Sequence, residues 1–164
     1  DSTTPTTEPV SGVGVEDDAG LKREAGKGDS GSEAGPDAGP VDIHQFCLDE
    51  VNKHRAVAGV GPLARWTANE SCVDGQAMAD FVAGRSHSNF NACTETGSTA
   101  CTDWPGTDRQ GTVRDCVQTF WDEGPGDFST HSNYMTLVKP SFTKVACGIY
   151  VTPGGRLWAD LAFQ

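Results

Sequence analysis

Apolar residues recur at the spacing of a helical face in three segments of the chain. The first segment begins at Asp42, which has Gln45 three positions later as in a capping box, and it ends at a Gly-Val-Gly-Pro run, residues 59–62. The second runs from Thr67, which forms a capping box with Glu70, to Gly84 and is rich in alanine, so we expect another element to pack closely against it. The third begins at a predicted cap, Thr112, and carries an apolar stripe of Val113, Cys116, Val117, Phe120 and Trp121.

Near the end of the chain, apolar residues recur at every second position instead. Residues 144–151 and 156–163 each place their apolar side chains on one face, and a Thr-Pro-Gly-Gly turn separates them. These two segments predict an antiparallel hairpin. Residues 90–111, rich in Gly, Ser and Thr, are predicted to form a loop. Helices around a loop-rich stretch and a closing hairpin indicate an α+β layered domain.

The first forty residues differ from the rest in composition. Between Asp1 and Pro40 there is no aromatic residue and no cysteine, and acidic, Gly, Ala, Pro and Thr residues dominate. So few large apolar side chains cannot offset the entropy of ordering the backbone. We therefore predict that residues 1–40 are a disordered acidic leader or spacer and that residues 41–164 are the folded domain. We also expect an export signal before residue 1, and a lost N-terminal lipid anchor is one alternative for how the leader is attached.

Six cysteines lie in the last three quarters of the chain, and no two of them form a Cys-x-x-Cys pair. Structural zinc ribbons and thioredoxin-like centres need such pairs, so the spacing favours three disulfide bridges formed in an oxidising compartment. Sequence leaves the pairing open; the pairs we expect are Cys47–Cys72, Cys93–Cys101 and Cys116–Cys147. The protein is thus predicted to be secreted or on the cell surface.

The net charge of −11 argues against nucleic acid and anionic membrane surfaces as partners, and no stretch is apolar enough for a transmembrane span.

Short motifs from residue 43 to residue 164 resemble, in order and spacing, the CAP domain (also called the SCP domain) of cysteine-rich secretory proteins, venom antigens and plant pathogenesis-related proteins. The segments that carry the resemblance are Val51-Asn52-Lys53-His54-Arg55, Gly61-Pro62-Leu63 with Trp66, Ser86-His87-Ser88, Trp121-Asp122-Glu123, Asn133-Tyr134-Met135, and Lys144-Val145-Ala146-Cys147-Gly148 with Trp158. The resemblance implies a three-layer α-β-α sandwich with a central antiparallel sheet and a large surface cleft.

In that family the cleft carries two His and two Glu that can hold a divalent metal, often zinc. The resemblance assigns the first His to His87, the first Glu to Glu95 and the second Glu to Glu123. Asn133 stands where the family usually has the second His, and an amide oxygen is a poor zinc ligand. His131, two residues earlier, could substitute only if the loop shifts.

Two classes of function follow for the cleft. The first is a non-catalytic extracytoplasmic module that binds a ligand or partner through a degenerate His/Glu cleft, with no certain cofactor. The alternative is a metal-assisted, protease-like hydrolase in which His87, Glu95 and Glu123 supply ligands and base, with zinc or another divalent cation. A third reading, sterol or lipid binding, comes from the resemblance alone.

Overall fold

The computed structural model describes residues 41–164; the predicted leader, its boundary and its anchor lie outside the described residues. Four helices and four strands follow in chain order. They are α1 (Ile43–Val57), β1 (Ala64–Arg65), α2 (Thr67–Ala83), β2 (Gly97–Pro105), α3 (Arg109–Asp122), α4 (Ser132–Leu137), β3 (Lys144–Val151) and β4 (Arg156–Phe163). None of the helices formed by residues 41–164 has the length and apolar character needed to cross a bilayer.

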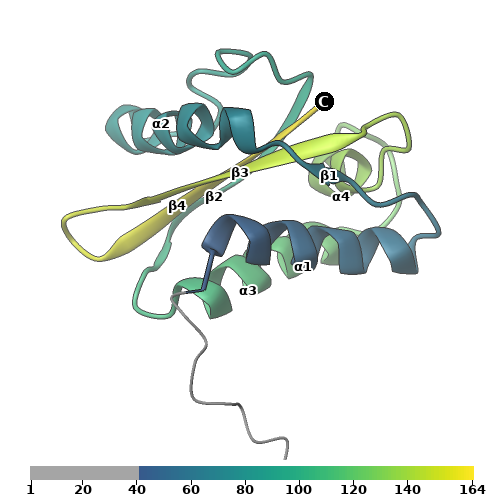
Figure 1. The fold of residues 1–164 in the computed structure, drawn as a ribbon, viewed down its shortest axis with the longest axis horizontal. Helices are drawn as coiled ribbons and strands as arrows, with labels where there is room; N and C mark the ends of the chain where they lie inside the picture. The colour runs from purple at the N-terminus through teal and green to yellow at the C-terminus, as the bar shows by residue number, and fades with distance from the viewer. Residues whose placement is uncertain (1–40) are drawn as a thin grey trace, which may run out of the picture. The chain divides into compact units, whose positions relative to one another are not determined.

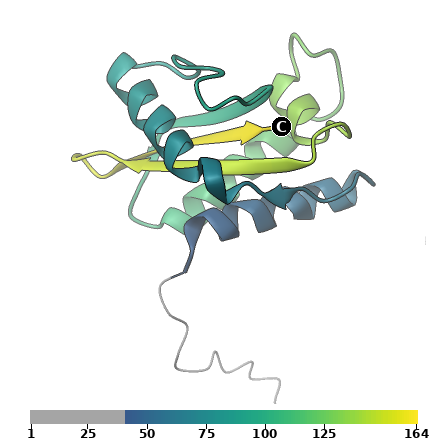
Figure 2. The ribbon, with the colours of Figure 1, turned by 45° about the horizontal axis from the view of Figure 1, so that its top comes forward.

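The strands form one sheet in the order β1-β3-β4-β2, sandwiched between helices (Figures 1 and 2). Helix α2 covers one face, and α1 and α3 lie side by side on the other. The predicted hairpin pairs β3 with β4 antiparallel, from Val145 opposite Phe163 to Val151 opposite Leu157. β2 is also antiparallel to β4, and only the two-residue β1 runs parallel to its neighbour. The α+β, three-layer prediction is confirmed.

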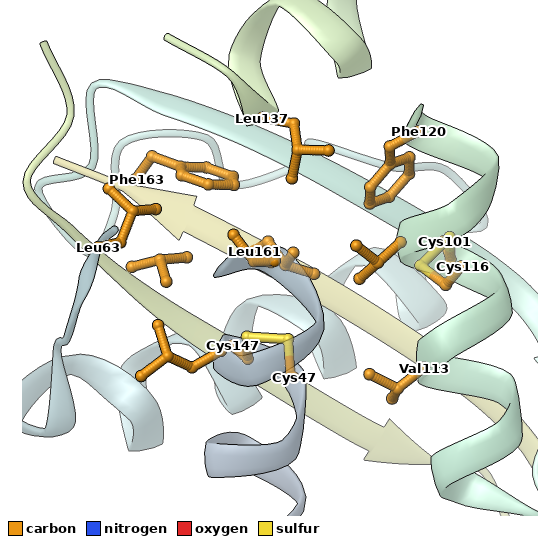
Figure 3. Close-up of a cluster of buried hydrophobic side chains, with 14 of the residues drawn as sticks. Cys47, Leu63, Cys101, Val113, Cys116, Phe120, Leu137, Cys147, Leu161 and Phe163 are labelled. Carbon is orange, nitrogen blue, oxygen red and sulfur yellow. A yellow bond between two sulfur atoms is a disulfide. The ribbon is translucent and has the colours of Figure 1, made fainter. Parts of the chain in front are cut away.

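Each face of the sheet has its own buried cluster, because β4 is packed on both sides. Leu161 and Phe163 face α1 and α3 and belong to the larger cluster, which Figure 3 shows. Ala162 faces the other way, with Val73 of α2. The close approach predicted for the alanine-rich helix occurs at Gly148, where an added Cβ would lie 2.2 Å from the backbone carbon of Val73.

The chain forms three disulfides, but the predicted pairing is wrong. The bridges are Cys47–Cys147, Cys72–Cys93 and Cys101–Cys116. The prediction favoured neighbours in sequence, yet Cys47 lies on α1 and Cys72 on α2, helices on opposite faces of the sheet. Likewise Cys101 belongs to the α1/α3 cluster, whereas Cys93 belongs to the cluster under α2. Each bridge therefore closes within one face; Figure 3 shows the two on the α1/α3 face, Cys47–Cys147 and Cys101–Cys116.

Several element boundaries also differ from the predictions. Residues 97–105, expected to be loop, form the edge strand β2. Asp42 caps α1 as predicted, but α3 is capped by Asp108, and the Thr112 hydroxyl donates instead to Pro105 O at 2.5 Å. At α2, Trp66 occupies the N-cap and Glu70 forms an ion pair with Arg65, so the expected capping box is absent. Thr112 and Glu70 thus bond to residues of neighbouring strands instead of capping their own helices.

Candidate functional site

A surface cleft of about 270 Å³ lies between the loop that precedes β2, the start of β2 and the α4 region. Its lining combines imidazole, hydroxyl and amide groups with two phenylalanines that are more than half exposed, Phe90 and Phe128. The lining residues are His87, Phe90, Thr96, Gly97, Ser98, Phe128, Ser132, Asn133 and Thr136. The cleft thus brings together two of the five residues singled out from the sequence, His87 and Asn133.

His87 lies in the tight turn that follows α2. Its backbone is in the left-handed region (φ 56°), which costs energy for a residue with a Cβ. The carboxylate of Asp80 holds this turn: Oδ2 accepts from His87 N at 2.6 Å, and Oδ1 accepts from Ser88 N at 2.7 Å and from Ser88 Oγ at 2.5 Å. On the cleft side, His87 Nδ1 lies 2.9 Å from Ser98 Oγ. The ring is therefore anchored at the backbone and at one nitrogen.

Glu95 is buried beneath the loop rather than facing the cleft. Only 1% of the residue is exposed, and its carboxylate accepts from Gln76 Nε2 at 2.7 Å, Asn91 N at 2.5 Å and Cys93 N at 3.0 Å. These three donors come from α2 and from the loop itself. Glu95 thus organises the loop that carries His87.

The carboxylate of Glu123 is likewise engaged in hydrogen bonds, in this case with residues of α4. It accepts from Asn133 N at 2.9 Å, Asn133 Nδ2 at 2.5 Å and Tyr134 N at 3.1 Å. Since these backbone groups belong to the first turn of α4, Glu123 caps that helix from the end of α3. Asn133 lines the cleft, whereas Glu123, to which it is hydrogen-bonded, is not part of the lining.

The side chain of His131 is engaged in contacts with its own loop and is not placed as a metal ligand. Its Nδ1 donates to the backbone oxygen of Glu123 at 2.5 Å, and its ring packs against Gly126, where an added Cβ would come within 2.1 Å of His131 Cδ2. The loop shift that would bring His131 to the place of the missing family histidine is not seen.

These residues do not fit a zinc ion. The family would supply two imidazoles and two carboxylates, but here one imidazole lines the cleft, and both carboxylates already accept three hydrogen bonds each. Between residues 41 and 164 no group of three or more His, Cys, Asp or Glu side chains is arranged to hold a metal.

Sequence reasoning missed a pair of buried acids behind His87. Asp80 of α2 is 1% exposed and Asp160 of β4 is 7% exposed, and both line a cavity of about 10 Å³, next to the cleft, with Glu95 and His87. Burial, and then the neighbouring Asp80 carboxylate, raise the pKa of Asp160 to about 8. The sequence did carry a signal: Asp160 is the single charged residue between apolar neighbours in the closing strand.

The family model described as the cysteine-rich secretory protein family, CAP, matches residues 48–159, more than half of the chain. The chain belongs to the CAP family. This confirms the resemblance seen in the sequence motifs. Proteins of this family are typically extracellular, and three disulfides agree with that compartment. No curated protein matches the chain in sequence.

Solved structures of CAP proteins share the fold at low sequence identity. BmVAL-1 is similar over 79% of this chain and 79% of its own, with a TM-score of 0.61 and 14% identity. NaASP2, solved with Zn²⁺, is similar over 78% of this chain and 82% of its own, with a TM-score of 0.59 and 16% identity. This chain spans 40% of the length of Na-ASP-1, for which the TM-score is 0.56 and the identity 12%. At such identities the likeness extends to the fold alone.

Proposed function

We propose that this CAP domain is a non-catalytic, extracytoplasmic binding module whose cleft takes a small uncharged ligand. The observation that carries the proposal is the lining of the cleft: hydroxyl, amide and imidazole groups beside two exposed aromatic rings, with no carboxylate, lysine or arginine among them. A pocket of this kind offers stacking area and a few directional hydrogen bonds, as small-molecule sites do.

The state of the two glutamates supports a binding role over hydrolysis. A metal-assisted hydrolase needs an ion with an open coordination position and a carboxylate free to act as base. Glu95 and Glu123 instead accept hydrogen bonds that hold the loop and α4. Neither glutamate is therefore free to act as a general base, and both hold the segments that line the cleft.

Charge supports an uncharged ligand. The chain carries a net charge of −11, which disfavours anionic ligands such as sulfated sugars. A cationic ligand, in turn, would find no carboxylate in the cleft lining. A compound with several hydroxyl groups and one apolar face suits a lining that offers polar groups from Ser98 and Asn133 and aromatic rings from Phe90 and Phe128.

The test is a protein-observed NMR screen of the full chain with three fragment sets: uncharged polyhydroxyl or aromatic-alcohol fragments, anionic fragments, and apolar fragments. We expect the uncharged set to shift resonances of Ser98 and Asn133 and to lose affinity in Phe128→Ala. Phe81→Ala, which removes a similar ring from another face, is the matched control and should bind as the parent does. Binding of only the apolar set would favour the lipid-binding alternative, and hydrolysis of any fragment would overturn the non-catalytic assignment.

A further inference from the structure

The outer edge of β3 is covered by another strand over only part of its length. β1 pairs with Lys144 and Val145 alone, and just beyond β1 the Trp66 N–H donates to Val145 O at 2.8 Å. Among the described residues, no strand continues this pairing along residues 146–151. Backbone N–H and C=O groups of alternate residues therefore point out of the sheet here, and such an edge is a template for a further strand.

Side chains from both helical layers bind to these edge groups. From α1, His44 Nδ1 lies 2.6 Å from Cys147 O, and because a carbonyl oxygen can only accept, Nδ1 carries the hydrogen. From α2, Asp74 Oδ1 accepts from Ile149 N at 2.7 Å. The two side chains also approach each other, with His44 Nε2 3.8 Å from Asp74 Oδ2. Since α1 and α2 lie on opposite faces of the sheet, this contact, the His44–Asp74 strap, passes around the edge of β3 (Figure 2).

Both ends of the His44–Asp74 strap are fixed against β3. Three residues after His44, Cys47 forms a disulfide with Cys147, the residue whose carbonyl oxygen His44 binds. On the other face, α2 approaches Gly148 so closely that an added Cβ would lie 2.7 Å from Asp74 N. The short side chain of Asp74 can therefore reach the next amide of the strand. The helices are thus held beside the same edge groups that their side chains bind.

The surface next to the strap would favour an added strand. Met78 and Val82 follow Asp74 at i+4 and i+8 on α2, so the three residues share one face of the helix. The two apolar residues are 48% and 76% exposed. The ring of Phe81 lies 5.5 Å from that of Tyr150, which places this part of α2 beside the end of β3. An open edge bordered by exposed apolar side chains is prone to pairing, which natural proteins block with polar and charged groups.

A second copy of the chain supplies a matching edge. The contacts of Val145, Cys147 and Ile149 show that alternate residues of β3 face outward, so the next outward N–H and C=O belong to Val151. Two such edges related by a two-fold axis run antiparallel and present the same alternation of donors and acceptors to each other. The second copy would also bring its own exposed Met78 and Val82 to the same interface.

We propose that the His44–Asp74 strap closes the outer edge of β3 against pairing with another strand, and that the strand it excludes is β3 of a second copy. The strap occupies one acceptor and one donor that an incoming strand would need. Removing its two side chains frees these groups and leaves the pairing of β3 with β4 untouched. The proposal is independent of the cleft, because the cleft is lined by the start of β2, at the opposite edge of the sheet.

The test is sedimentation equilibrium of the full chain over a concentration series. We expect the parent to be a monomer and the double variant His44→Ala with Asp74→Ala to form a reversible dimer, a twofold increase in mass at high concentration. The matched control is Gln118→Ala with Asp122→Ala, which removes another exposed hydrogen-bonded pair, on α3, and should stay monomeric. If the double variant does not fold, as judged by near-UV circular dichroism, Asp74→Ala alone takes its place, because it frees Ile149 N and removes the contact with His44.

Amide hydrogen exchange shows whether the dimer forms through this edge. Exchange of the Val151 amide should be at least about tenfold slower in the concentrated double variant than in the dilute monomer. Three results would overturn the proposal: a folded variant that stays monomeric, an association that leaves Val151 exchange unchanged, or a parent already paired through β3. Protection of Val151 by an added unrelated extended peptide, but not by a second copy, would overturn the choice of partner and assign the edge to a strand of another protein.

Discussion

Asn133 donates two hydrogen bonds to the carboxylate of Glu123, one from its backbone N–H and one from its side-chain amide. Helix α4 has no side-chain cap of its own at His131, so the last turn of α3 supplies it from a distance. Asn133, which stands where the family usually has a histidine, is thus also the residue that binds Glu123, the carboxylate expected to be a ligand beside that histidine. Asn133 therefore belongs both to the wall of the cleft and to the junction between α3 and α4.

Removing the Glu123 carboxylate should therefore destabilise the protein. We expect Glu123→Ala to lower the free energy of unfolding by about 1–2 kcal/mol, the usual cost of losing an N-cap, in urea titrations. The neighbouring Asp122→Ala removes the same charge from an exposed side chain that accepts a hydrogen bond from Gln118, and it should stay within about 0.5 kcal/mol of the parent. Equal losses in the two variants would mean that charge, and not capping, explains the effect.

Zinc binding should respond to residue 133. We expect the parent to bind zinc weakly, since Asn133 supplies an amide and occupies one oxygen of Glu123. Asn133→His adds an imidazole and frees that oxygen, so zinc affinity measured by calorimetry should rise at least about tenfold and fall again in Asn133→His with His87→Ala. Tight stoichiometric binding by the parent would contradict this and would return the hydrolase alternative to consideration.

The raised pKa of Asp160 predicts how stability changes with pH. The native pKa, about 8, exceeds the ordinary value of 3.8, so between these values the unfolded chain loses a proton that the folded chain keeps. The contribution of Asp160 to stability is therefore complete below about pH 4, falls by about 1.4 kcal/mol per pH unit up to about pH 8, and is constant above that. We expect the free energy of unfolding of the parent, measured by urea titration, to fall by about 2–3 kcal/mol more between about pH 5 and pH 7 than that of Asp160→Asn. A constant difference between the two proteins would contradict the raised pKa.

Close packing of α2 on the sheet should make Gly148 intolerant of a methyl group. A Cβ there would overlap the backbone of Val73 and Asp74, so Gly148→Ala should cost about 1–3 kcal/mol or more. Gly75, on α2 itself, has nothing within 4 Å of its Cβ position, and Gly75→Ala should stabilise the protein by about 0.5–1 kcal/mol. A lower melting temperature for Gly148→Ala and a higher one for Gly75→Ala would confirm the prediction. Equal shifts of the two melting temperatures would contradict it.

Periodicity predicted the elements whose burial pattern is regular. The three long helices and the β3–β4 hairpin were found because each keeps an apolar face over several turns or alternations. Strand β2 (Gly97–Pro105) was not predicted because most of its residues are small or polar and show no regular alternation; it forms by pairing with β4. Helix α4 has only six residues, too few for a period, and is capped by a residue distant in sequence.

Only part of the candidate site could be predicted from the sequence, because motifs locate residues but not their hydrogen-bond partners. Motif matching placed His87 and Asn133, which do line the cleft. It could not foresee that Glu95 and Glu123 would each be engaged by three local donors, since hydrogen-bond partners depend on the path of the loop. Nor could it place Asp80 and Asp160, eighty positions apart in the chain, around the one small cavity that both line once α2 packs on β4.

The bridge between Cys47 and Cys147 has a consequence for how the protein matures. The two cysteines are separated by 100 residues, so during N-to-C-terminal synthesis Cys47 emerges long before its partner exists. Cys72 is the first cysteine to follow it, which makes Cys47–Cys72 the mispair that early oxidation favours. The other two bridges, with separations of 21 and 15 residues, close within short stretches of nascent chain. Correct oxidation of the first helix must therefore wait for nearly the entire domain, or proceed by exchange from that early mispair.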